Sequence, residues 1–144
     1  MQTNESLKLE NQLCFSLYAA SRLVTKCYQP ILDNLGITYP QYLVLMVLWE
    51  SDSVNLSLLS EKLKLQSNTL TPLLKRMQEM GLVDRIRSQK DERSIVISLT
   101  AKGEALKSEA HRLPAQLMDN IGITKAEATQ LHTLLTKLIL DIKA

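Results

Sequence analysis

Apolar residues recur at helical spacing along most of the chain, starting near the N-terminus. Over residues 5–35 they alternate between intervals of four and three, which predicts one long helix with an apolar stripe. Gly36 is well placed to end this helix in a left-handed cap. The stripe consists of Leu13, Leu17, Ala20, Val24, Cys27 and Ile31.

The second predicted helix is apolar on nearly every side. Thr38 and Gln41 have the spacing of a capping box, and Pro40 between them is tolerated in a first helical turn. The following YLVLMVLWE has almost no polar face, which predicts a buried central helix.

Two amphipathic helices follow a turn at residues 51–54. The first is predicted over Leu56–Leu63, and a tight connection leads to the second, Ser67–Met80, closed by Gly81. If Ser67 caps the second helix, Pro72 falls in its second turn and removes one backbone hydrogen bond. The helix is therefore expected either to start later, near Thr69 or Thr71, or to have an irregular first turn.

The period then changes from helical to alternating. Residues 82–88 and 94–100 predict two strands joined by the charged tip QKDER. Thr100 caps a predicted helix over residues 101–121, bent at Pro114. Thr124 and Glu127 form a second capping box for a last helix, whose broad apolar face holds Leu131, Leu134, Leu135, Leu138, Ile139 and Ile142.

This element order predicts a mostly α fold with a small β-hairpin: a winged helix-turn-helix. In such a fold the second helix enters the major groove of DNA, and the hairpin tip reaches the backbone or the minor groove. Hydroxyl, amide and cationic side chains at these places suit phosphate and base contacts, and Asp91 is placed to orient Arg93. The alternatives are a solvated polar face or a protein-interaction module. The candidate DNA-binding residues are Ser67, Asn68, Thr69, Thr71, Lys75, Arg76, Arg85, Arg87, Lys90, Asp91 and Arg93.

Composition and charge limit the number of domains, the type of core and the location of the protein. The length of 144 residues suits one domain, and 45% hydrophobic but only 4% aromatic residues predict an aliphatic core. The net charge of +2 permits nucleic-acid binding without arguing for it. No apolar run is long enough for a membrane span, and the N-terminus lacks the pattern of a signal peptide, so a cytoplasmic protein with reduced thiols is expected.

The two cysteines, Cys14 and Cys27, lie on the first predicted helix. Thirteen residues of helix separate their Cα atoms by roughly 20 Å, which excludes an intrachain disulfide while the helix is intact. Cys27 belongs to the apolar stripe and is expected to be a small buried hydrophobe. Cys14 shares a neighbouring stripe with hydroxyl donors that can stabilise a thiolate, so both a sensor role and a structural role stay open. These donors are Tyr18, Ser21, Thr25 and Tyr28.

Enzyme and metal chemistry have little support. His111 and His132 stand alone, without Cys, Asp or Glu at ligand spacing, so no metal site and no cofactor is expected. The chain shows neither a phosphate-binding glycine loop nor a nucleophile–base motif. A non-enzyme is expected.

TLTPLLKRMQEMGLVDRIRSQKDERSIVISLT resembles the core of the MarR family of bacterial repressors, including its D-x-R wing pattern at Asp91 and Arg93. LCFSLYAASR and ITYPQYLVLMVLWE resemble the OhrR-type organic-hydroperoxide sensors. The resemblance is strongest over residues 13–100 and weak after Gly103. It implies a single domain over residues 1–144 that dimerises through residues 1–36 and 101–144 and reads a pseudo-palindromic DNA site with residues 37–100.

The resemblance also implies roles for the thiol and the phenols. Cys14 matches the reactive cysteine, Tyr28 and Tyr39 match tyrosines that bond its thiolate across the dimer, and Tyr18 is a third member; Tyr42 is expected in the core. No cysteine follows Cys27, as in one-cysteine sensors, so a small thiol would trap oxidised Cys14, or it would over-oxidise. An intersubunit bridge between Cys14 and Cys27 stays open.

The expected function is therefore a repressor released from DNA when an organic hydroperoxide oxidises Cys14. Such a reaction is stoichiometric and is not turnover. Three alternatives remain: a regulator that responds to a phenolic ligand, with Cys14 incidental; a thiol peroxidase; and a protein-interaction winged helix.

Overall fold

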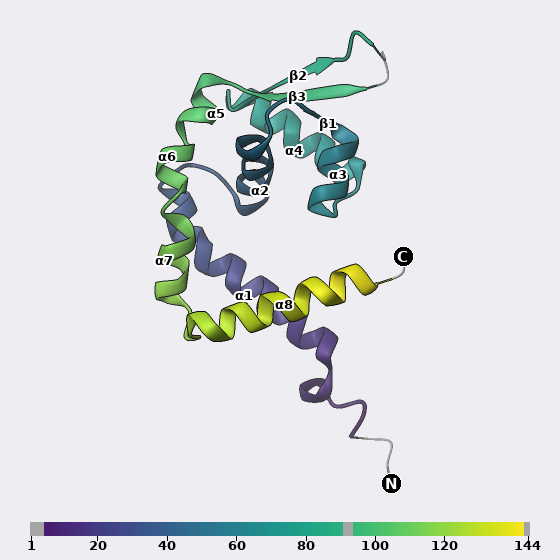
Figure 1. Ribbon diagram of the computed structural model, residues 1–144, viewed down its shortest axis with the longest axis vertical. Helices are drawn as coiled ribbons and strands as arrows, with labels where there is room; N and C mark the ends of the chain where they lie inside the picture. Colours follow the sequence, from purple (N-terminus) through teal and green to yellow (C-terminus); the bar gives the residue numbers. More distant parts are fainter. Residues whose placement is uncertain (1–4, 91–93, 143–144) are drawn as a thin grey trace.

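The structure is a computed structural model that describes residues 5–90 and 94–142 (Figure 1). Its elements form a long N-terminal helix, a compact helical group capped by a small sheet, and a helical C-terminal arm. The long helix is α1 (Leu13–Asp33), preceded by the 3₁₀ turn η1 (Leu9–Asn11). The compact group contains α2 (Tyr39–Glu50), β1 (Val54–Asn55), α3 (Leu56–Leu63), α4 (Ser67–Glu79), β2 (Val83–Arg87) and β3 (Ile95–Leu99). The arm contains α5 (Ala101–Ala105), α6 (Lys107–Ala110), α7 (Leu113–Asn120) and α8 (Lys125–Asp141).

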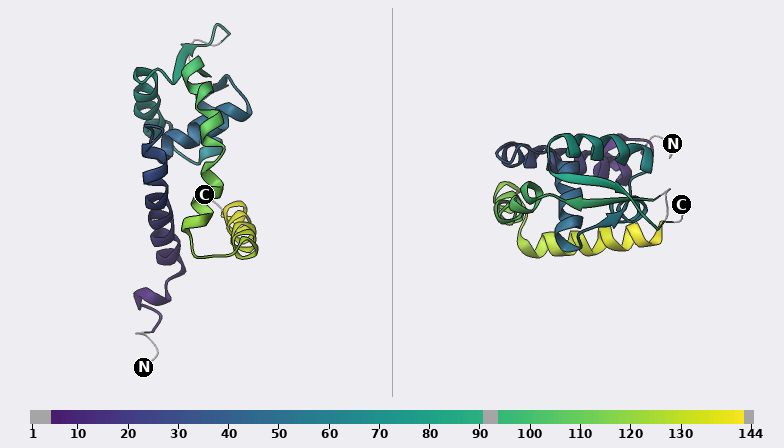
Figure 2. Two further views of the ribbon diagram at one scale, coloured as in Figure 1. Left: turned by 90° about the vertical axis from the view of Figure 1, so that its left-hand side faces the viewer. Right: turned by 90° about the horizontal axis from the view of Figure 1, so that it is seen from above.

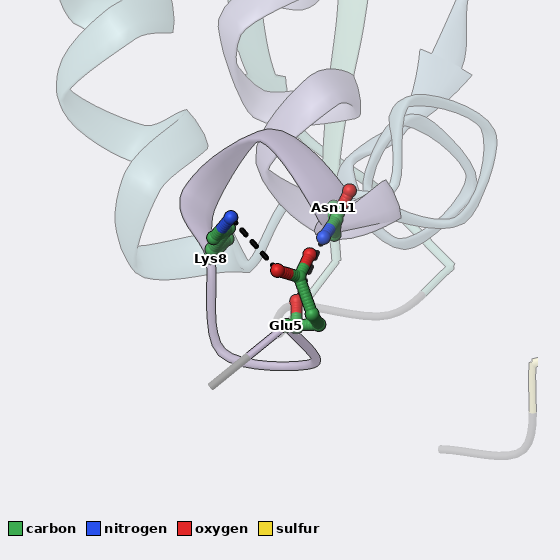
Figure 3. Close-up of polar contacts among 3 residues, drawn as sticks. All are labelled: Glu5, Lys8 and Asn11. Atoms are coloured by element: carbon green, nitrogen blue, oxygen red, sulfur yellow. Dashed lines mark hydrogen bonds and ion pairs between the residues drawn. The ribbon is translucent and has the colours of Figure 1, made fainter. Parts of the chain in front are cut away.

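The first helix starts later than the sequence predicts, at Leu13 instead of residue 5. The Asn11 amide donates to the backbone carbonyl of Glu5 at 2.7 Å, and Lys8 pairs with the Glu5 carboxylate at 2.9 Å (Figure 3). The Gln12 amide donates to the carbonyls of Ser6 and Lys8. These side chains take carbonyls that a continuous helix would need, and this local competition explains the wrong prediction.

The predicted central helix is confirmed in α2. The Thr38 hydroxyl accepts from the Gln41 amide at 3.4 Å, and the Gln41 side chain accepts from the Thr38 amide at 3.0 Å. Both interactions of the predicted capping box are therefore present. The helix lies at the centre of the core, which its residues Tyr42, Val44, Leu45, Val47 and Leu48 share with side chains of every neighbouring element.

The two amphipathic helices form the predicted helix-turn-helix. Asn55 caps α3 through its side chain, and Lys64 adopts a left-handed backbone with φ 58° in the connection. The next helix includes Pro72 and begins at Ser67, so of the two alternatives expected for it the later start is wrong. Since Asn68 is exposed, water can satisfy the carbonyl that Pro72 leaves without a partner. Leu70, Leu74 and Met77 are buried.

The hairpin is confirmed but belongs to a three-stranded antiparallel sheet in the order β1-β3-β2. The residue pairs of β2 and β3 run from Val83 opposite Leu99 to Arg87 opposite Ile95. The additional strand contains Val54, which was predicted as part of a turn and pairs with Ile97. A strand of two residues is too short to show the alternation on which strand prediction depends.

The predicted helix over residues 101–121 is broken into α5, α6 and α7. The last break lies just before Pro114, which takes an early position in α7 as the predicted bend requires. Figure 2 shows α7 running beside α1, whereas α8 stands apart from α1. The capping box at Thr124 and Glu127 is confirmed. Among the described residues, no helix has the length and apolar character needed to cross a membrane.

Candidate DNA interface and thiol site

The exposed side of α4 carries most of the residues predicted to contact DNA. Burial of Leu70, Leu74 and Met77 fixes the rotation of the helix, and Ser67, Asn68, Thr69, Lys75 and Arg76 remain exposed on it. Thr71 differs, because it is half-buried and its hydroxyl donates to the Ser67 carbonyl at 2.9 Å. Its hydroxyl hydrogen is thus used within the helix, which leaves the oxygen as an acceptor.

The wing extends from the end of the molecule opposite the N-terminus (Figure 1). Arg87 and Lys90 are exposed, and Arg85 is half-buried on β2 where it pairs with Ile97. Asp91 and Arg93, predicted to form the tip of the wing, lie outside the described residues. The roles of the wing residues stay predictions.

Three phenol rings form a cluster between α1 and the start of α2, here called the tyrosine cluster: Tyr28, Tyr39 and Tyr42. The ring centroids of Tyr28 and Tyr39 are 4.9 Å apart, and Tyr42 lies 6.0 Å from Tyr28 and 6.2 Å from Tyr39. Tyr42 is buried, as expected for a core residue. Burial, followed by the neighbouring Tyr39 and Tyr42, raises the pKa of Tyr28 to about 12. The phenol of Tyr28 is therefore a neutral hydrogen-bond donor at physiological pH.

Cys14 lies at the other end of α1, within its first turn. Fourteen residues of helix place it about 20 Å from Tyr28, so one chain does not bring the thiol to the tyrosine cluster. Both cysteines are free. Cys14 is exposed. Cys27 is half-buried, which is less than expected for a residue of the apolar stripe.

Tyr18 also stays away from the tyrosine cluster. It is 61% exposed, and the Arg22 guanidinium lies 5.3 Å from its ring centroid. Such a contact holds the ring against α1, one turn from Cys14. Of the predicted redox residues, the structure therefore groups Tyr28 with Tyr39 and leaves Cys14 with Tyr18 near the start of α1.

Sequence reasoning missed a junction between α2 and α5. The Trp49 indole nitrogen donates to the Gly103 carbonyl at 3.0 Å. Two signals pointed to it: a buried indole N–H needs an acceptor, and a glycine within a helical pattern often marks close packing. Neither signal names the partner, because the two residues are far apart in the sequence.

A mainly apolar hollow of about 370 Å³ lies between α2 and the C-terminal arm. It is lined by Tyr42, Met46, Trp49, Glu50, Lys107, Ala110, His111 and Pro114. Over residues 5–90 and 94–142, no three His, Cys, Asp or Glu side chains are grouped as metal ligands would be.

A helix-turn-helix followed by a β-hairpin on a three-stranded sheet defines a winged helix-turn-helix protein, a class that reads DNA. Residues 26–110 match the model of the family described as transcriptional regulator SarA/Rot. The chain is 50% identical over 130 residues to the organic hydroperoxide resistance transcriptional regulator of Bacillus subtilis, with 90% of this chain and 86% of that protein covered.

Solved structures agree with this class. AbfR of Staphylococcus epidermidis, in a structure described as reduced and bound to DNA, has 37% identity and a TM-score of 0.82, covering 97% of this chain and 95% of that one. For AbfR with a disulfide the TM-score is 0.65 at 38% identity, with 96% and 97% covered. Reduced MarR of E. coli has 26% identity and a TM-score of 0.70, with 88% and 96% covered.

The chain therefore belongs to the MarR family of transcriptional regulators, in its OhrR-type branch. The resemblance stated from the sequence is confirmed. The relatives are regulators of transcription, which confirms the expectation that the chain is not an enzyme.

Proposed function

We propose that the chain is a cytoplasmic repressor that binds a pseudo-palindromic DNA operator as a homodimer and releases it when an organic hydroperoxide oxidises Cys14. The observation that carries the proposal is the division of the site along α1. The exposed thiol lies at one end of this helix, and a cluster of neutral phenols lies at the other. The end that carries Cys14 lacks the tyrosine cluster, and the tyrosine cluster lacks Cys14.

Two-fold symmetry offers a way to join the halves. If the α1 helices of two copies crossed antiparallel near Ser21, Cys14 of each would face Tyr28 of the partner subunit, because Ser21 lies midway between them. Tyr39 would follow, since its ring packs against that of Tyr28 at a tilt of 35°. The dimer would use residues 1–36 and 101–144, and exposed apolar side chains on α1 and α8 support such an interface. They include Leu13, Leu23, Leu131, Leu134, Ile139 and Leu140.

The chemistry follows from a thiolate beside neutral phenol donors. The thiolate of Cys14 attacks the peroxide O–O bond, which gives a sulfenic acid and releases the alcohol. A low-molecular-weight thiol then condenses with the sulfenic acid, forming a mixed disulfide and water. Phenols that donated hydrogen bonds to the thiolate lose this acceptor and must make room for the adduct, which strains the interface.

DNA release follows if this strain changes the spacing of the two DNA-binding regions, residues 37–100 of each copy. Half-sites one helical turn apart require the two α4 helices at a matching separation of about 34 Å. The exposed Lys75 and Arg76 on α4, with the wing residues up to Arg93, would then lose their register on the phosphates. Support comes from relatives: the Bacillus subtilis protein is named for organic hydroperoxide resistance, and AbfR has been solved reduced on DNA and as a disulfide.

The test compares Cys14→Ser with Cys27→Ser. Both variants are bound to a duplex selected by the reduced wild-type protein from a random-sequence pool, and limiting cumene hydroperoxide is added. The wild type and Cys27→Ser should leave the DNA, with the mass change on Cys14, whereas Cys14→Ser should stay bound. Release of Cys14→Ser by the peroxide would refute the proposal.

A second candidate function is a response to a phenolic ligand, favoured by the hollow between α2 and the C-terminal arm. Its apolar wall and the ammonium group of Lys107 would suit an aromatic carboxylate. Salicylate would then release Cys14→Ser as well as the wild type. A Met46→Trp variant, which fills the hollow, would lose the salicylate response and keep DNA binding.

A further inference from the structure

Ring-to-ring contacts link four of the six aromatic residues of the protein, here called the row: Tyr28, Tyr39, Tyr42 and Trp49. The row starts at the tyrosine cluster and ends at Trp49, the single tryptophan of the chain. The ring centroids of Tyr42 and Trp49 are 6.3 Å apart at an angle of 64°, an edge-to-face contact. In an otherwise aliphatic core, this row connects α1 with the far end of α2.

The row continues through a hydrogen bond into the base of the wing. The Trp49 indole donates to the Gly103 carbonyl at 3.0 Å. The amide of Gly103 donates to the Thr100 hydroxyl at 3.1 Å, and this hydroxyl donates to the Gly81 carbonyl at 2.6 Å. Gly103 is thus bonded on one side to α2 and on the other to the residues just before β2.

The contact at Gly103 is close enough to transmit small displacements. A methyl group on Gly103 would lie 2.2 Å from the Leu82 carbonyl oxygen and 3.1 Å from the Leu99 side chain. Leu82 directly precedes β2, and Leu99 ends β3. Backbone therefore packs on backbone without an intervening flexible side chain, and tightly packed elements move together.

We propose that Trp49 is the positioning residue that couples the tyrosine cluster to the wing. A displacement of Tyr28 or Tyr39 moves Tyr42, the edge contact moves the Trp49 indole, and the bond to Gly103 moves the base of β2 and β3. The inference rests on the proposed function, because it needs oxidation of Cys14 to disturb the tyrosine cluster. It adds a route to the wing within each subunit, besides any change in the spacing of the two subunits.

The indole itself provides a direct test, because the protein contains one tryptophan. Cumene hydroperoxide should change the Trp49 emission of the wild type, because the indole and the Gly103 carbonyl bonded to it move with the tyrosine cluster. Cys14→Ser should show no change. Emission that stays unchanged while oxidised protein leaves the DNA would overturn the proposal.

A conservative variant tests the coupling separately. Trp49→Phe keeps an aromatic ring and removes the donor, so the reduced variant should bind DNA within about threefold of the wild type. One hydrogen bond is worth roughly fivefold in an equilibrium constant. The ratio of DNA affinities before and after oxidation should therefore fall about fivefold, at unchanged oxidation of Cys14 by mass. Val47→Ala, a buried change on the same helix but outside the row, should leave this ratio unchanged.

The outcomes separate this inference from the proposed function. If Cys14→Ser is still released by the peroxide, the proposed function fails. If the wild type responds as proposed and oxidised Trp49→Phe is released as fully as the wild type, only the coupling role of Trp49 fails. An equal loss of response in Trp49→Phe and Val47→Ala would show a general effect of core stability and would also overturn that role.

Discussion

Substituting Gly103 by alanine tests the packing between the wing and the C-terminal arm. The added methyl would lie 2.2 Å from the Leu82 carbonyl oxygen, whereas real Cβ atoms essentially never come closer than 3.0 Å to another heavy atom. The opposing atom belongs to the backbone, so no side-chain rotation relieves the overlap. The α5 backbone and the base of β2 must therefore separate by about 1 Å.

The cost follows from three contributions. Forced overpacking in a core costs about 1–3 kcal/mol. The separation also weakens the bonds that Trp49 and Thr100 make to Gly103, each worth about 1 kcal/mol. Alanine regains about 1 kcal/mol over glycine within a helix. The expected loss of unfolding free energy is about 2–3 kcal/mol.

Urea unfolding followed by circular dichroism measures this loss at a fixed protomer concentration, because association shifts apparent stability. With a slope of about 2 kcal/mol/M, the midpoint of Gly103→Ala should fall by about 1–1.5 M. Gly122→Ala is the matched control, since a methyl there meets no atom within 4 Å. The control should lie within about 0.5 kcal/mol of the wild type. Equal midpoints for the two variants would refute the packing argument.

Three further predictions concern the caps, the phenols and the DNA contacts. Thr124→Ala removes the side-chain cap of α8 and should cost about 1 kcal/mol in urea unfolding, whereas Thr129→Ala, within the same helix, should cost much less; equal losses would contradict the capping role. The folded pKa of Tyr28, about 12, lies above its ordinary 10.0, so stability should fall as pH rises between these values. Tyr28→Phe should remove the last step of a phenolate absorbance titration, and loss of a step near pH 10 instead would contradict this. Lys75→Ala should lower the slope of log affinity against log salt by about one, and Lys137→Ala on α8 should not; equal slopes would remove α4 from the interface.

Local signals in the sequence predicted most of the helices and their boundaries. The capping boxes at Thr38 and Thr124 each need only residues within one turn, and both are present. Gly36 and Gly81 were predicted to close helices, and both adopt positive φ, at 70° and 78°. Such features depend only on residues within a few positions of one another, so the sequence alone is enough to predict them.

The errors occurred where a non-local or competing contact decided the structure. Val54 forms a strand because Ile97 lies opposite it, a partner that the sequence pattern does not show. The start of α1 moved to Leu13 because Asn11 and Gln12 bond to preceding carbonyls. The pairing of Trp49 with Gly103 joins residues that no short motif connects.

The candidate redox site also depends on contacts that a sequence pattern does not show. Cys14 and Tyr28 lie on one rigid helix, about 20 Å apart, so no folding of a single chain brings them together. Helical periodicity placed both residues on one stripe, but a stripe extends along the helix and gives no contact between its ends. The surface around Cys14 is also where apolar side chains such as Leu13 remain exposed. Any association that covers this surface therefore also sets the environment of the thiol. If the proposed homodimer forms, the reactivity of Cys14 therefore depends on the assembly, because one chain leaves the thiol exposed and far from the tyrosine cluster.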